Sequence, residues 1–85
     1  MPKDDLVRMR HILDAAREAL SFTAGKTRVD LNANRMLVLS LVKEIEIIGE
    51  AAGKISEETK NKYKTIPWLD MIDMRNHLIH VYFEV

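Results

Sequence analysis

Four side chains near the end of the chain have the chemistry of a site that binds a phosphate and moves a proton. They are Arg75, Asn76, His80 and Tyr82. An imidazole can take a proton from a hydroxyl near neutral pH. A guanidinium can hold a phosphate through two hydrogen bonds and stabilise the charge that develops on it. An asparagine amide can bind a phosphate oxygen or fix the imidazole tautomer, and a tyrosine hydroxyl can position a phosphate or be modified itself.

The helical period separates two members of this group. At about 100° per residue, Arg75 lies in the middle of an apolar stripe, and His80 lies about 140° away from it. The stripe is formed by Trp68, Met71, Ile72, Leu78, Ile79 and Tyr82. Arg75 and His80 could converge only in a cleft against another helix or across a dimer interface. We therefore expect that a monomer is not the working unit.

A guanidinium inside an apolar stripe also has a purely structural interpretation. Burying such a charge is costly unless it is paired. Arg75 could extend its charged end to water, or it could bond an acid of the preceding long helix, such as Glu44 or Glu46. Spacing alone leaves the structural and the chemical roles of Arg75 open.

The polar side of the same segment allows two further interpretations. Asp73, His77 and His80 are spaced so that they could bind zinc or another divalent ion from one helix face. Two histidines with one acid are a weak signal, and no second set of ligands is evident, so we expect no metal. The remaining interpretation is an ordinary polar face in contact with solvent.

Apolar residues recur at steps of three and four along the whole chain, which predicts helices and no strand. Long helices are expected over about 4–22, 30–53 and 68–82, with a short helix over 56–63. The expected fold class is all-α, an antiparallel helical bundle of three long helices plus one short helix. Residues 1–85 are expected to form a single domain.

Short polar and small residues mark the expected helix ends. Candidate N-caps are Asp4 or Asp5, Asp30 or Asn32, and Ser56, and Pro67 suits the start of the last helix. The small residues between Gly49 and Gly53 would let another backbone approach closely. An alternative interpretation of this cluster is a helix end with Gly53 as its C-terminal cap.

Composition excludes several classes of protein. The 85 residues contain no cysteine, so there is no disulfide scaffold and no thiolate zinc site. Thirteen basic and thirteen acidic residues give zero formal net charge, which does not suggest a general electrostatic grip on nucleic acid or on an anionic membrane. No apolar run approaches the roughly 20 residues of a membrane span, and the charged N-terminus lacks a signal sequence. We therefore expect a soluble cytoplasmic protein with no membrane association.

Three parts of the chain resemble the HepT-like ribonucleases, which belong to the HEPN superfamily of small helical domains. The segment from Arg75 to Tyr82 matches that family's motif of Arg, four residues, His, one residue and Tyr. The run 44–52 resembles the family's second long helix, and the Ile-Pro-Trp sequence at 66–68 resembles the entry into its motif helix. The resemblance covers nearly the whole chain.

The resemblance implies a homodimer in which two motifs meet in a cleft and cleave RNA without a metal or other cofactor. The 2′-hydroxyl attacks the adjacent phosphorus and leaves a cyclic phosphate. By the same resemblance, His80 is the acid or base, Arg75 stabilises the phosphate and Asn76 assists. Three lysines of the preceding segment could add positive charge to such a cleft beside Arg75, or they could form an ordinary face in contact with solvent. These are Lys60, Lys62 and Lys64.

The resemblance also implies a partner and a switch. Proteins of this type are typically toxins encoded beside a minimal nucleotidyltransferase antitoxin, which transfers AMP onto the motif tyrosine, here Tyr82. The added bulk and negative charge would block an RNA phosphate at Arg75 and His80. Family members continue past the motif, so this chain is expected to lack the family's C-terminal helix and to leave apolar surface around Tyr82 and Phe83 uncovered. The alternative hypothesis is a non-catalytic dimeric helical interaction module that binds such a partner.

Overall fold

The computed structural model describes residues 1–82, and every regular element in this part of the chain is a helix. The helices are α1 (Lys3–Thr23), α2 (Arg28–Ala33), α3 (Arg35–Lys54), α4 (Glu57–Lys62) and α5 (Trp68–Tyr82). The predicted all-α helical bundle is confirmed. Within these residues, no helix combines the length and the apolar character that crossing a membrane requires.

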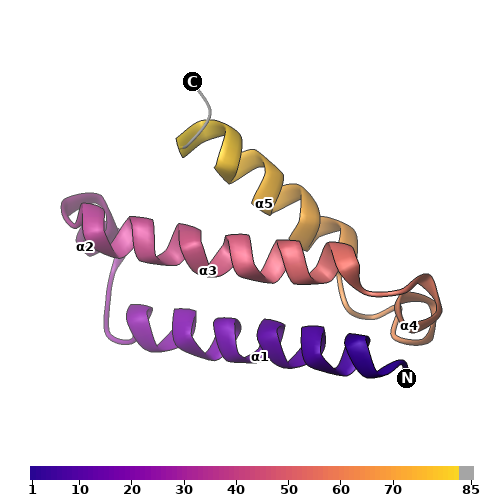
Figure 1. The fold of residues 1–85 in the computed structure, drawn as a ribbon. Helices are drawn as coiled ribbons and strands as arrows, with labels where there is room; N and C mark the ends of the chain where they lie inside the picture. Colours follow the sequence, from indigo (N-terminus) through magenta and orange to yellow (C-terminus); the bar gives the residue numbers. More distant parts are fainter. Residues whose placement is uncertain (83–85) are drawn as a thin grey trace.

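Helix α3 is the centre of the fold. Helix α1 packs along one side of it and α5 along another, and these two pairs make most of the contacts between helices (Figure 1). The short α2 lies at the start of α3. Along its course α5 diverges from α3, so its first turns are packed more closely than its last (Figure 1). Because α5 carries the candidate site, α3 is the surface that positions it.

The second long helix was predicted to begin at Asp30 or Asn32, and that prediction is wrong. Thr27 caps α2 in a capping box, because its hydroxyl accepts from the amide of Asp30 while Asp30 accepts from the amide of Thr27 at 2.8 Å. Asn34 then leaves the helical backbone and caps α3 by accepting from the amide of Leu37 at 3.0 Å. The side chain of Asn34 thus takes the place of a backbone acceptor for the Leu37 amide, and the helix is interrupted there. The described bundle therefore contains two short helices, α2 and α4.

The small residues between Gly49 and Gly53 allow a close approach of another helix and do not form a helix C-cap. Gly53 does not cap α3, because the helix continues to Lys54 and is followed by Ile55 in extended backbone. Among the described glycines only Gly25 has a positive φ, at 73°. A Cβ at Gly53 would meet no atom within 4 Å, whereas one at Gly49 would overlap a neighbouring helix. The C-cap prediction is wrong, and the predicted close approach is confirmed at Gly49.

The apolar core lies where the first turns of α5 meet the end of α3. Ala52, Ile55 and Trp68 are buried, and partly buried side chains from α1 and α5 pack around them. The indole nitrogen of Trp68 donates to the backbone oxygen of Tyr63 at 3.1 Å, so the polar edge of this ring is satisfied inside the core. Trp68 thereby anchors the start of α5.

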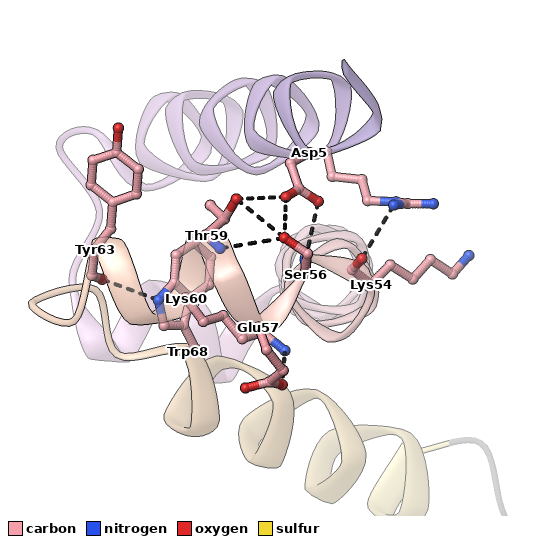
Figure 2. A network of polar contacts seen from close by, with 9 residues as sticks. Asp5, Lys54, Ser56, Glu57, Thr59, Lys60, Tyr63 and Trp68 are labelled. Atoms are coloured by element: carbon pink, nitrogen blue, oxygen red, sulfur yellow. Dashed lines mark hydrogen bonds and ion pairs between the residues drawn. The ribbon is translucent and has the colours of Figure 1, made fainter. Parts of the chain in front are cut away.

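A buried carboxylate ties the first turn of α1 to the start of α4. Asp5 accepts hydrogen bonds from the amide of Ser56 at 3.1 Å and from the hydroxyls of Ser56 and Thr59 at 2.5 and 2.6 Å (Figure 2). The bonds from Ser56 and Thr59 lower the pKa of Asp5 despite its burial. Asp5 lies in the first turn of α1 as predicted, but Pro2 occupies the N-cap position. The predicted N-cap at Ser56 is confirmed, since its hydroxyl accepts from the amide of Thr59.

The predicted apolar stripe of α1 is only half covered. Met9 and Ala16 are partly buried, but Leu6, Leu13 and Leu20 are 56%, 41% and 71% exposed. A shallow apolar groove of about 740 Å³ runs along this part of α1. The single chain thus leaves an apolar surface that a partner could cover.

Candidate active site

Proline and tryptophan set where the motif helix begins. Pro67 precedes α5, and its carbonyl accepts from the amide of Met71 at 3.1 Å. Trp68, the first residue of the helix, is 8% exposed in the core. A helix that is fixed at this end carries Arg75 and the residues after it in a defined direction, and the prediction that Pro67 starts the helix is confirmed.

Arg75 lies against the backbone of α3 at Gly49. A Cβ placed on Gly49 would overlap the Cβ of Arg75 and would lie 2.8 Å from the Cγ of Arg75 and 2.8 Å from the carbonyl oxygen of Met71. Gly49 is buried and Arg75 is partly buried. The two helices cross so closely here that only a residue without a side chain fits in α3.

The charged end of Arg75 turns away from this crossing. Its Nη1 donates to Oδ1 of Asn76 at 3.1 Å, while its Nε is buried without a hydrogen-bond partner. Asn76 lies about 100° and His80 about 140° from Arg75 around the helix axis. The bond to Asn76 therefore draws the guanidinium from the apolar stripe toward the side of the helix on which His80 projects.

Within residues 1–82, Arg75 forms no ion pair with an acid of α3, so this alternative is wrong. Glu46 forms an ion pair with Lys43 at 3.8 Å. The carboxyl of Glu44 lies beside that of Glu18 on α1, in a groove that both residues line. The guanidinium of Arg75 is thus not neutralised by either predicted partner.

Glu44 is a buried acid whose environment the sequence did not reveal. It is 5% exposed, and its Oε2 has no hydrogen-bond partner. Burial, together with the adjacent carboxyl of Glu18, raises the pKa of Glu44 to about 7, while the charge of Lys43 opposes this shift. These acids line a groove between α1 and α3 with His11 and Asp14. The only signal for Glu44 in the sequence was its spacing, three residues after Leu41 and four before Ile48, which places an acid on an apolar side of the helix.

The polar residues predicted on the motif helix face solvent. Asp73, Asn76, His77 and His80 are all exposed. Within residues 1–82, no group of three or more such acids and histidines is arranged so that it could hold a metal ion. The metal-site interpretation of Asp73, His77 and His80 therefore gains no support from the geometry.

Tyr82 is the last residue that the structure describes. It lies two turns beyond Arg75, about 10 Å further along the axis and on nearly the same side of the helix. Because α5 has diverged from α3 there, Tyr82 is 42% exposed whereas Arg75 is partly buried (Figure 1). Tyr82 is thus accessible to another molecule. Phe83, predicted to share its apolar surface, lies outside the described residues.

Of the three lysines that could supplement Arg75, two have other partners in the structure. Lys60 is mostly buried and contacts Glu57 at 3.9 Å, and Lys62 lies over the ring of Tyr63 at 5.7 Å. Lys60 and Lys64 line a groove at the start of α5. The structure therefore places this positive charge around Trp68, at the other end of α5 from His80.

With this geometry in hand, comparison with known proteins identifies the class. The family model described as "Ribonuclease HepT-like" matches residues 12–85, a range that includes the whole of α5. The chain belongs to this HepT-like ribonuclease family. No solved structure gave a significant match to the chain.

Curated relatives cover the chain well. A "gamma-glutamylcyclotransferase and putative RNase" of Methanocaldococcus jannaschii is 36% identical over 85 residues, which is all of this chain but 38% of that protein. A "putative RNase" of the same organism is 34% identical over 87% of this chain and 68% of its own length. A "probable ribonuclease HepT" of Thermococcus cleftensis is 32% identical over 91% of this chain and 70% of its own length. The chain therefore spans well under half of the first of these proteins and about two thirds of the other two.

Proposed function

We propose that this chain is an endoribonuclease and that α5 carries its active site. The proposal depends above all on one observation: the family match extends over a helix on which Arg75 is held against α3 with its guanidinium turned toward the His80 side. A guanidinium and an imidazole carried by one helix supply the charge and the proton acceptor that phosphodiester cleavage requires. The names of the relatives point to the same activity.

The proposed reaction is an intramolecular transesterification of RNA. The ribose 2′-oxygen attacks the adjacent phosphorus while His80 takes up the hydroxyl proton, and the bond from phosphorus to the 5′-oxygen breaks. The departing 5′-oxygen receives a proton from a histidine, which leaves a 2′,3′-cyclic phosphate and a 5′-hydroxyl. Arg75 donates hydrogen bonds to the phosphoryl oxygens, where negative charge increases in the transition state. No metal ion takes part in this scheme.

We further propose that the active unit is a homodimer. Arg75 and His80 leave one helix in directions about 140° apart, so a phosphate held by Arg75 is more readily reached by an imidazole from a second copy. The exposed leucines of α1 show that the single chain has apolar surface to spare for association. Two copies would place two arginines and two histidines around one cleft.

The position of Tyr82 supports a proposal about regulation by a partner. We propose that a cognate minimal nucleotidyltransferase antitoxin transfers AMP to the Tyr82 hydroxyl, with the oxygen attacking the α-phosphorus of ATP and pyrophosphate leaving. Tyr82 is exposed and shares a helix side with Arg75. The new phosphodiester would place negative charge where an RNA phosphate approaches. In this scheme the chain is the toxin of a cytoplasmic toxin–antitoxin pair.

Two variants with a matched control test the assignment of the site. His80→Ala and Arg75→Ala are each expected to lower RNA cleavage at least a hundredfold, about 2.7 kcal/mol in transition-state energy. His77→Ala removes an equally exposed histidine of the same helix and is expected to leave cleavage within about threefold. All variants should keep the helical circular dichroism of the parent. Equal losses in all three would contradict the roles of Arg75 and His80.

A second candidate function is favoured by the uncovered apolar stripe of α1. A non-catalytic dimeric module could use Leu6, Leu13 and Leu20 to bind a nucleotidyltransferase partner. This hypothesis expects stable complex formation and no RNA cleavage by the parent chain. Cleavage that depends on His80 would exclude it.

A further inference from the structure

Helices α3 and α5 approach closely where Gly49, which lies outside the proposed site, meets Arg75, which lies within it. We propose that Gly49 is a positioning residue for Arg75: the missing side chain lets α5 settle on α3 so that the arginine stem is held and its guanidinium is directed to the reacting phosphate. This inference rests on the proposed ribonuclease function for its activity readout only. Its structural readout stands without that function.

The close approach cannot be relieved by a side-chain movement. A Cβ at Gly49 would collide with the Cβ of Arg75, an atom that every residue except glycine possesses, and would lie 2.8 Å from the backbone oxygen of Met71. An alanine at position 49 therefore requires α5 itself to shift or rotate relative to α3. Any such movement carries Arg75 with it, because the residue lies at the crossing.

The present crossing restrains the arginine at two points. Its stem lies against Gly49, and its Nε is buried without a hydrogen-bond partner. Its Nη1 is bonded to Oδ1 of Asn76. Because Nε makes no hydrogen bond, it does not fix the orientation of the guanidinium. That orientation is fixed by the bond to Asn76 and by the packing of the arginine stem at Gly49. In this proposal the guanidinium N–H groups other than the buried Nε and the one bonded to Asn76 bind the anion, and prior alignment of such donors lowers the cost of binding the transition state.

The chain offers matched controls for the glycine. Gly53→Ala makes the same change one turn later in α3, where a Cβ would meet nothing within 4 Å. Thr59→Ala removes a hydroxyl that bonds the buried Asp5, so it should lower the melting temperature without touching the α3–α5 crossing. Gly53→Ala shows how much of the effect of Gly49→Ala comes from helix propensity, and Thr59→Ala shows how much comes from a general loss of stability. The remainder is due to the displacement of Arg75.

The first test follows the Nε proton of Arg75 by nitrogen-15 NMR, assigned by its loss in Arg75→Lys. In the parent protein this proton should exchange with water at least tenfold more slowly than that of Arg10, whose side chain is 71% exposed. Gly49→Ala should abolish the difference, whereas Gly53→Ala and Thr59→Ala should retain it. If Arg75 exchanges as fast as Arg10 in the parent, the proposal is overturned, and this result does not depend on whether Gly49→Ala folds.

The second test measures RNA cleavage. Gly49→Ala is expected to lower kcat at least tenfold with a smaller change in KM, because the alignment of Arg75 matters most when charge develops. Gly53→Ala and Thr59→Ala should keep kcat within about twofold. Unchanged kcat and unchanged exchange in a folded Gly49→Ala would refute the proposal. A parent protein that cleaves no RNA would instead contradict the proposed function, and the exchange measurement would still decide the role of Gly49.

Discussion

Arg75 donates a hydrogen bond from Nη1 to Oδ1 of Asn76, its immediate neighbour on α5, over 3.1 Å. Adjacent residues of a helix point about 100° apart, so their side chains do not normally meet. The guanidinium must bend around the helix to make this bond, which carries its charge away from the α3 contact and toward the side of His80. We therefore propose that Asn76 orients the arginine.

Replacing Asn76 by alanine should misdirect Arg75 without unfolding the protein. Asn76 is exposed, so the change should leave the melting temperature within about 3 °C of the parent value. Cleavage is expected to fall about tenfold, since one orienting hydrogen bond to a charged group is lost. Steady-state kinetics on a short RNA provide the measurement. A variant with unchanged kcat would show that the guanidinium needs no help from Asn76.

Combining two inactive variants tests whether the active site spans two chains. Subunits carrying Arg75→Ala and subunits carrying His80→Ala are each expected to be inactive alone. If the arginine of one copy acts with the histidine of the other, each mixed dimer has one complete pair of its two, and about half of all dimers are mixed, so mixing should restore roughly a quarter of the parent activity. The experiment requires subunit exchange, which mass spectrometry of isotope-labelled chains can verify. No recovery in verified mixed dimers would place the reacting pair within one chain.

The bonds to Asp5 predict a loss of stability in acid. Its folded-state pKa is lowered from 3.8 because it accepts bonds from Ser56 and Thr59, so its stabilising contribution is present above 3.8 and is lost as the pH falls through the folded value. Asp5→Asn should be less stable than the parent at pH 7, and the difference should shrink in acid. Urea unfolding at a series of pH values measures this. A difference that is independent of pH would show that the charge of Asp5 is immaterial.

The acid pair between α1 and α3 predicts the opposite dependence at higher pH. The folded-state pKa of Glu44 is raised from 4.5 to about 7 by burial and by Glu18, so its favourable protonated form is fully present below 4.5 and is lost as the pH rises through 7. The parent protein should lose stability across this window, whereas Glu44→Gln should lose less. The same urea series checks this, with Glu46→Gln as a control whose acid is paired with Lys43. Parallel curves for the parent and Glu44→Gln would contradict the assigned burial cost.

Local signals in the sequence predicted much of the fold. Pro67 and Ser56 mark helix starts through short-range backbone effects, and both predictions are confirmed. The break at Asn34 was missed because the apolar period continues on both sides of it, while the interruption depends on one capping side chain. The partner of Asp5 lies 51 residues away, and no local pattern reveals such a contact.

The candidate site was predictable in its residues but not in its orientation. The spacing placed Arg75 in an apolar stripe, and the small residues around Gly49 indicated a close approach. Neither pattern indicated that these two features meet, because the pairing depends on how α5 crosses α3. The bond from Arg75 to Asn76 was equally hidden, since helical spacing argues against contact between neighbours.

The most direct measurement is the cleavage of a defined RNA in the presence of EDTA, comparing the parent chain with His80→Ala at equal helicity and analysing the product ends. We predict that the parent protein cleaves the RNA and leaves 2′,3′-cyclic phosphate and 5′-hydroxyl ends, and that His80→Ala does not. Cleavage that requires an added metal ion, or that survives intact in His80→Ala, would contradict the proposed site.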